Sequence, residues 1–189
     1  MHQIAIFASG SGSNAQRIAE YFAGHPHVRV GLILTNNPRA GVIDRARQLD
    51  IPVVVFTREQ FYGPGGVVAQ LQFFNIDFVV LAGFLWLVPE SLIAAYPDRI
   101  VNIHPALLPA YGGKGMYGMK VHEAVVAAGE KASGITIHLI DNEYDRGRIV
   151  FQAQCPVTPA DTPADVARKV QALEHEHFPP VIEKLVLAQ

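Results

Sequence analysis

The sequence predicts an α/β fold in which a mostly parallel, twisted sheet of about seven strands is covered by helices on both faces. Short apolar runs, typical of strands buried on both faces, alternate with helix-like segments along residues 4–103. The length of 189 residues suits a single domain with a substantial core, and 50% of the residues are apolar. No repeat, low-complexity tract or linker interrupts the pattern, so we expect one domain over residues 1–189 with right-handed crossovers.

Each element follows from its local pattern. Strands are predicted at 4–8, 28–34, 53–56, 78–82, 100–103, 135–140 and 149–153. Helices are predicted at 15–22, 42–49, 67–74, 89–96 and 121–128. A last helix begins after Thr162 as N-cap, with Pro163 in its first turn, and is expected to break at Pro179-Pro180. In the strand at 135–140, Thr136 and His138 share one face, which predicts a half-exposed strand.

Ligands of open parallel sheets bind beyond the carboxyl ends of the strands. Three segments fall there: the turn after the first strand, the segment 83–88 and the segment 102–109. In the last of these, Asn102 and His104 are two apart, so their side chains point to the same side of an extended chain. Pro105 keeps His104 out of helical geometry. An amide and an imidazole placed side by side can stabilise an oxyanion and move a proton, which acyl transfer requires.

The turn after the first strand reads Gly10-Ser11-Gly12-Ser13-Asn14 and leads into a helix. Glycines let the backbone approach a ligand, and the helix N-terminus supplies free N–H groups that favour a phosphate. Ala15 stands where a dinucleotide fingerprint has its third glycine, a substitution that some such fingerprints tolerate. The acid that would read a dinucleotide ribose is missing from residues 34–37, so a monophosphate is favoured over a dinucleotide. A glycine-rich turn without a ligand is the other interpretation.

An acidic turn, residues 141–147, links the last two predicted strands. It is either a solvated loop or the source of an acid that orients His104. Asp141, Glu143 and Asp145 are all candidates for that acid. His138 lies on the polar face of the strand leading to this turn and is a secondary candidate for lining a site.

Composition excludes several classes of function. The net charge of −2 gives no reason to expect nucleic acid or a membrane as partner, and no apolar stretch is long enough to span a bilayer. Cys155 is the only cysteine and the N-terminus lacks a signal-peptide pattern, so a reducing cytoplasm is expected. No histidine pair has the spacing of a metal-binding helix, so no metal is expected.

These motifs resemble, in order and spacing, those of the folate-dependent formyltransferases. The shared features are the Gly-Ser-Gly-Ser-Asn loop, Leu81-Ala82-Gly83-Phe84, the Asn-x-His-Pro-x-Leu-Leu-Pro segment at 102–109 and Asp145-x-Gly147. The Asn-x-His-Pro segment alone indicates the superfamily. The serine-rich loop and the length indicate the phosphoribosylglycinamide formyltransferases within it.

The resemblance implies a single-domain Rossmann-like formyltransferase fold with a phosphate-binding βα half, 1–103, and a folate and catalytic half, 104–189. It implies that Asn102, His104 and Asp145 are catalytic, with His104 held protonated by Asp145. Ribonucleotide-binding residues would be Ser11, Gly12, Ser13, Asn14, Gln171 and Glu174. Folate-binding residues would be Phe84, Leu85, Trp86, Leu87, Val88, Asp141, Asn142 and Glu143. The co-substrate would be 10-formyltetrahydrofolate, and the partners would be small molecules, with a monomer or a weak homodimer both open.

The chain departs from the family pattern in three places. Trp86 stands where many members carry arginine, and folate binding is expected to survive because the contacts there are thought to be made by the backbone. The segment 111–119 is longer than in familiar members and brings Lys114. Arg146 and Arg148 flank Gly147. These cations are interpreted as solvated charges in preference to contacts with the folate glutamate tail.

Rival interpretations predict other features. Methionyl-tRNA formyltransferases would add a C-terminal domain and a basic face, and formyltetrahydrofolate hydrolases would add an N-terminal regulatory domain. Sugar-nucleotide formyltransferases lack the serine-rich loop. A non-catalytic nucleotide-binding module is the rival from a different class.

Overall fold

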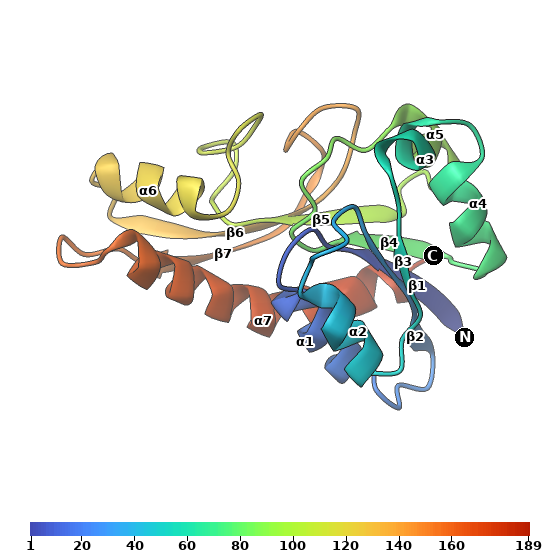
Figure 1. Cartoon of the computed structure of the whole chain (residues 1–189). Coiled ribbons are helices and arrows are strands. Elements are labelled where there is room, and N and C mark those ends of the chain that lie inside the picture. The colour runs from blue at the N-terminus through green and yellow to red at the C-terminus, as the bar shows by residue number, and fades with distance from the viewer.

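The computed structural model describes residues 1–189 and contains a single seven-stranded sheet, ordered β3-β2-β1-β4-β5-β6-β7 (Figure 1). The strands are β1 His2–Phe7, β2 Val28–Thr35, β3 Val53–Val55, β4 Phe78–Leu81, β5 Ile100–His104, β6 Ala132–Leu139 and β7 Ile149–Pro156. Strands β1 to β5 pair in parallel, whereas β6 pairs antiparallel with both β5 and β7. The sheet is therefore mixed, with its parallel part in the half expected to bind phosphate.

The helices are α1 Ser13–Tyr21, α2 Val42–Gln48, α3 Arg58–Tyr62, α4 Gly66–Phe73, α5 Glu90–Ala95, α6 Met119–Ala127 and α7 Pro163–Leu187. Helices α1, α2 and α7 lie on one side of the sheet, and α3, α4 and α5 lie together on the other (Figure 1). None of these helices combines the length and the apolarity needed to span a bilayer. The predicted coverage of both faces is confirmed.

Alternate residues of each central strand feed two separate cores. In β1, Ile4 and Ile6 join a cluster of 30 buried residues on the α1–α7 side, whereas Ala5 and Phe7 join a cluster of 15 on the other side. Both faces of the strand are buried, which explains why its sequence is a continuous apolar run. In β2, the register with β1 shifts past Gly31, and this irregularity keeps the apolar side chains on the correct faces.

Two predictions about elements were wrong. Helix α7 continues through Pro179 and Pro180, because Phe178, Val181 and Ile182 are buried in the larger core and hold the helix in place. Strand β6 is not half-exposed: Thr136 and His138 are 0% and 1% exposed. Their polar face is covered by the loop after β5, so it faces protein and not solvent. Helix α3 was also missing from the prediction.

Candidate functional site

A cavity of about 750 Å³ lies at the carboxyl ends of β1, β4 and β5. The chain leaves β1 towards β2 and leaves β4 towards β5 on the opposite side, so the connections diverge here and leave a crevice. Ser9 ties these strand ends together: its hydroxyl donates to Asn36 Oδ1 at 2.8 Å and accepts from the Leu85 N–H at 3.2 Å. The sheet topology therefore places the cavity where the sequence predicted a ligand.

Most of the residues predicted from the sequence line this one cavity. They are Ser11, Asn14, Phe84, Leu85, Trp86, Leu87, Val88, Asn102, His104, Asp141, Glu143, Asp145, Gln171 and Glu174. Gly12, Ser13 and Asn142 are not among the lining residues, although Gly12 and Ser13 lie between two that are. Lys114 lines the cavity as an exposed side chain, whereas Arg146 and Arg148 do not line it.

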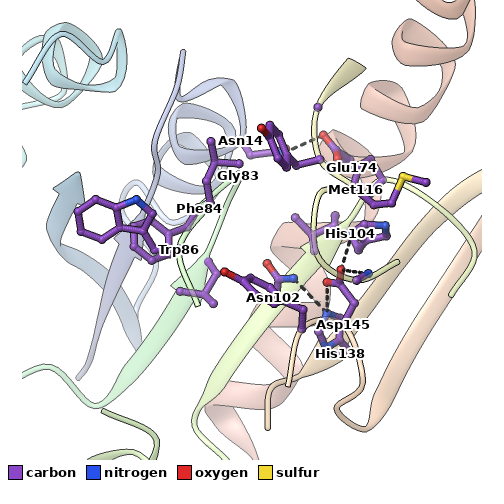
Figure 2. A pocket seen from close by; sticks show the side chains of 18 of the residues that line it. Asn14, Gly83, Phe84, Trp86, Asn102, His104, Met116, His138, Asp145 and Glu174 are labelled. Atoms are coloured by element: carbon purple, nitrogen blue, oxygen red, sulfur yellow. Dashed lines mark hydrogen bonds and ion pairs between the residues drawn. The ribbon is translucent and has the colours of Figure 1, made fainter. Parts of the chain in front are cut away.

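His104 and Asp145 face each other at the floor of the cavity (Figure 2). The distance from His104 Nδ1 to Asp145 Oδ2 is 3.5 Å, and both side chains are almost fully buried. The other ring nitrogen, Nε2, lies 2.7 Å from the Tyr111 carbonyl oxygen and donates to it. Asp145 Oδ2 also accepts the Gly113 N–H at 2.9 Å, so the loop after β5 binds both members of the pair.

His138 connects this pair to Asn102. Its Nδ1 lies 3.2 Å from the Leu139 carbonyl oxygen, and its Nε2 lies 3.0 Å from Asn102 Nδ2 and 3.7 Å from Asp145 Oδ1. Since a carbonyl oxygen only accepts, Nδ1 carries the proton and Nε2 accepts from the Asn102 amide. His138 thus orients the amide that the sequence placed beside His104.

Burial sets the charge of this cluster. Burial lowers the pKa of His104 below its ordinary value, although the Asp145 carboxylate and the Tyr111 carbonyl oppose that shift. Burial acts to raise the pKa of Asp145, but the two imidazoles and the Gly113 N–H outweigh it and leave that pKa lowered. Burial and the charges of the imidazoles and the carboxylate therefore act in opposite directions on this cluster.

The loop that carries His104 is fixed by polar side chains from the antiparallel strands. The Thr136 hydroxyl donates to the Ala106 carbonyl at 2.7 Å and accepts the Leu108 N–H at 2.9 Å. Gln152 Nε2 donates to both the Thr136 hydroxyl and the Leu108 carbonyl, at 2.8 and 3.0 Å. Because Thr136, Ala106 and Leu108 are buried, loss of the Thr136 hydroxyl would leave their backbone groups unpaired, so this hydroxyl helps to hold the loop in place.

The opposite end of the cavity joins the phosphate loop to α7. Asn14 Nδ2 donates to Glu174 Oε2 at 2.8 Å (Figure 2), and Gln171 Nε2 donates to the Ser13 hydroxyl at 3.1 Å. Burial raises the pKa of Glu174, and the bond from Asn14 only partly offsets this. The predicted pairing of Gln171 and Glu174 on one helix face is confirmed, and both side chains contact the loop.

An aromatic cluster forms the wall after β4. Trp86 packs against Phe56, Phe61 and Phe84, with ring centroids 5.7 to 6.3 Å apart. The Arg58 guanidinium lies 5.6 Å above the Trp86 ring. Trp86 is therefore held by packing and contributes a flat apolar surface to the cavity wall.

Several contributors to the site were missed from the sequence. The Tyr111 carbonyl and the Gly113 N–H are backbone groups, which no residue pattern reveals. Thr136 and Gln152 lie on predicted strands, and their polar character was the only signal that a buried partner lay opposite. No group of three or more His, Cys, Asp or Glu side chains is arranged to hold a metal ion.

Comparison with known proteins places this site in a family. A family model described as formyl transferase matches residues 2–182. Phosphoribosylglycinamide formyltransferase of Bacillus subtilis is 32% identical over 98% of this chain and 95% of its own length. This chain belongs to the phosphoribosylglycinamide formyltransferase family. The chloroplastic member from Arabidopsis thaliana is 45% identical over 95% of this chain, and the chain spans 64% of that relative's length. It spans 60% of the relative from Vigna unguiculata.

Solved structures of family members share the fold. Phosphoribosylglycinamide formyltransferase from Bacillus halodurans superimposes with a TM-score of 0.87 at 39% identity, covering 97% of this chain and 94% of that one. The protein of the same name from Anaplasma phagocytophilum gives a TM-score of 0.90 at 30% identity, covering 98% and 87%. The single mostly parallel α/β sheet predicted from the sequence is thus the fold of this family.

Proposed function

We propose that this protein transfers a formyl group from 10-formyltetrahydrofolate to the amine of N1-(5-phospho-D-ribosyl)glycinamide, a step of de novo purine synthesis. Family membership supports this reaction. The observation that carries the proposal is that one cavity of about 750 Å³ is lined at one end by Ser11 and Asn14 and at the other by Asn102, His104 and Asp145. A phosphate, an amine and an acyl donor could therefore meet in one space.

The ribonucleotide would lie along the end formed by α1 and α7. Its phosphate would bind the backbone N–H groups of residues 11–14, which lie at the N-terminus of α1. Gln171 and Glu174 would hold its ribose and glycinamide end. The folate would lie against residues 84–88, with Asp141 and Glu143 on the far wall. Both molecules are substrates, and the partners proposed are small molecules only.

The chemistry proposed needs no covalent bond to the protein. The substrate amine attacks the formyl carbon, and the formyl oxygen gains negative charge. Asn102 Nδ2 and the His104 N–H would stabilise that oxygen, exchanging their present acceptors, His138 Nε2 and the Tyr111 carbonyl, for it. The amine then loses a proton, the carbon–nitrogen bond to folate breaks, and the folate nitrogen gains a proton.

His104 is suited to carry that proton. The amine proton would pass through water to this pair, in which Nε2–H turns to the oxyanion and the free ring nitrogen, Nδ1, faces Asp145. The imidazolium formed would lie 3.5 Å from the Asp145 carboxylate, which stabilises its charge until the proton is passed to the folate nitrogen. Asp145 thus acts through His104.

The test is a spectroscopic assay with 10-formyl-5,8-dideazafolate and glycinamide ribonucleotide, with His104→Ala as the matched variant. We expect deformylated folate to be released only when the ribonucleotide is present, and release to be lost in the variant. Release without the ribonucleotide would indicate a hydrolase. Binding of the ribonucleotide without release would indicate a nucleotide-binding module, and either result would overturn the proposal.

A further inference from the structure

The backbone of the phosphate loop presents unpaired donors. The N–H groups of Ser11, Gly12, Ser13 and Asn14 donate to no backbone carbonyl and no side chain of the protein. Gly12 has φ +77°, a left-handed conformation that curls successive N–H groups towards one side. Successive N–H groups that point to one side without a protein partner form an arrangement that an anion would complete.

The carbonyls of the same loop are bound from behind by α2. The Gly10 carbonyl accepts the Val42 N–H at 3.1 Å, and the Ser11 carbonyl accepts Arg45 Nε–H at 2.8 Å. In a planar trans peptide, a carbonyl and the N–H that follows it point in opposite directions. Holding these two carbonyls towards α2 therefore turns the N–H groups of Ser11 and Gly12 away from α2.

Arg45 is the one side chain that donates a hydrogen bond to either of these two carbonyls, those of Gly10 and Ser11. Its guanidinium also donates to Gln16 Oε1 on α1, so it joins the loop to the helices on both sides of it. The backbone of Gly12 packs so closely on Val42 that an added Cβ would lie 2.5 Å from Val42 Cγ2. The loop is thus seated on α2, and Arg45 fixes the orientation of its central peptide.

The charge of Arg45 is not neutralised by a neighbouring acid. Arg17 lies 3.9 Å from Glu20 and Arg47 lies 3.2 Å from Asp44, whereas Arg45 forms no ion pair. Arg45 is half-buried beside Ser13, so its field is screened less than that of an exposed side chain. A positive charge therefore stands directly behind the N–H groups.

We propose that Arg45 is a positioning residue for the substrate phosphate. It orients the Ser11–Gly12 peptide by a charge-assisted hydrogen bond and adds an uncompensated positive charge behind the loop. This inference rests on the proposed function, because it assigns the loop to the phosphate of the ribonucleotide. It concerns binding of the phosphate and not the formyl transfer at the far end of the cavity.

The experiment compares Arg45→Met with Arg47→Met, which makes the same change in the same turn of α2 on an exposed side chain. Calorimetric titrations measure the Kd of glycinamide ribonucleotide and of glycinamide riboside, which lacks the phosphate. Loss of one hydrogen bond from a charged group predicts that Arg45→Met binds the ribonucleotide about 10- to 100-fold more weakly. The riboside should bind equally to all variants, and kcat at saturation should stay within about twofold of the original protein.

Arg45→Lys keeps the charge without the Nε–H bond, so its Kd for the ribonucleotide should fall between those of the original protein and Arg45→Met. Thermal unfolding establishes that each variant folds. The inference would be overturned if Arg45→Met bound the ribonucleotide with the same Kd as Arg47→Met. It would also be overturned if Arg45→Met raised the Kd of the riboside as much as that of the ribonucleotide. Failure of the proposed function would look different: the unmodified protein would transfer no formyl group to the ribonucleotide in the spectroscopic assay, whereas the comparison of Kd values requires only that the ribonucleotide binds.

Discussion

The two ends of the cavity are built in different ways. The phosphate loop consists of consecutive residues whose backbone N–H groups form the binding surface, and the chain needs only a turn and a helix N-terminus to make it. The other end consists of side chains from β5, from β6 and from the loop between β6 and β7, with Asn102 and His138 36 positions apart. The first end therefore depends on local backbone geometry, whereas the second depends on the register of two antiparallel strands.

The largest effects are expected where a side chain supplies the chemistry. Asn102→Ala and His104→Ala should each lower kcat about 100- to 1000-fold, because each removes a donor to the developing oxyanion. Steady-state kinetics with both substrates measure this. The Kd of the ribonucleotide should change little, since these residues lie at the far end of the cavity. Turnover close to that of the original protein in either variant would contradict the proposed roles.

A smaller effect is expected for the residue that orients the amide. His138→Phe keeps an aromatic ring but removes the acceptor 3.0 Å from Asn102 Nδ2, so kcat should fall about tenfold. His138→Gln retains a carbonyl oxygen that can accept from Asn102 and is the matched control, with kcat expected between the two. Equal activities of both variants in the formyl-transfer assay would show that orientation of Asn102 by His138 does not matter.

At the loop end, the backbone itself is the sensitive part. Gly12 and Gly24 have φ values of +77° and +72°, but an added Cβ would clash with Val42 only at Gly12. At either position, holding alanine in the left-handed conformation costs about 1–2 kcal/mol of stability. Gly12→Ala should lower the free energy of unfolding by at least about 1 kcal/mol more than Gly24→Ala. Urea unfolding measures both, and equal losses would mean that α2 does not support the loop.

The smallest effect expected is a pH dependence of stability. The folded-state pKa of His104 lies below its unfolded value of about 6.5, so between the two values only the unfolded chain binds a proton. The free energy of unfolding should therefore decrease as the pH falls from about 6.5 towards the folded-state pKa, by at most about 1.4 kcal/mol per pH unit, and level off below it. The lowered pKa of Asp145 acts separately, stabilising the fold above about pH 4 and ceasing to do so as the pH falls through the folded-state value.

Urea unfolding at a series of pH values, repeated with His104→Gln, checks this. The variant should lose part of the slope between about pH 6.5 and the lower folded-state pKa of His104, because it removes one titrating group. An unchanged slope would show that another buried group, such as His122, whose pKa is also lowered by burial, is responsible.

Much of the fold could be predicted because the parallel half follows local rules. Apolar segments marked β1, β2 and β4, and Gly10 to Asn14 marked the phosphate loop without any knowledge of the partners across the sheet. The antiparallel half was predicted less well. The alternation of Thr136 and His138 is the same for a strand facing solvent and for a strand facing a buried polar loop, so only tertiary contacts distinguish the two.

The choice among the acids of residues 141–145 shows the same limit. Asp141, Glu143 and Asp145 were equivalent on sequence grounds, and only the family resemblance selected Asp145. In the structure, Asp145 is the one of the three that reaches His104, whereas Glu143 forms an exposed ion pair with Arg146. Similarly, Pro179 and Pro180 predicted a helix end, but burial of their neighbours in the larger core outweighed the lost hydrogen bonds.

The hydrogen bond between Asn14 and Glu174 joins residues 160 positions apart, and β1 lies between β2 and β4 at the centre of the sheet. Contacts of such long sequence separation form late, because the loop-closure entropy must be overcome first. During refolding, secondary structure should therefore return before the ability to bind the ribonucleotide. Recovery of ribonucleotide affinity would then report the docking of α7 against the phosphate loop.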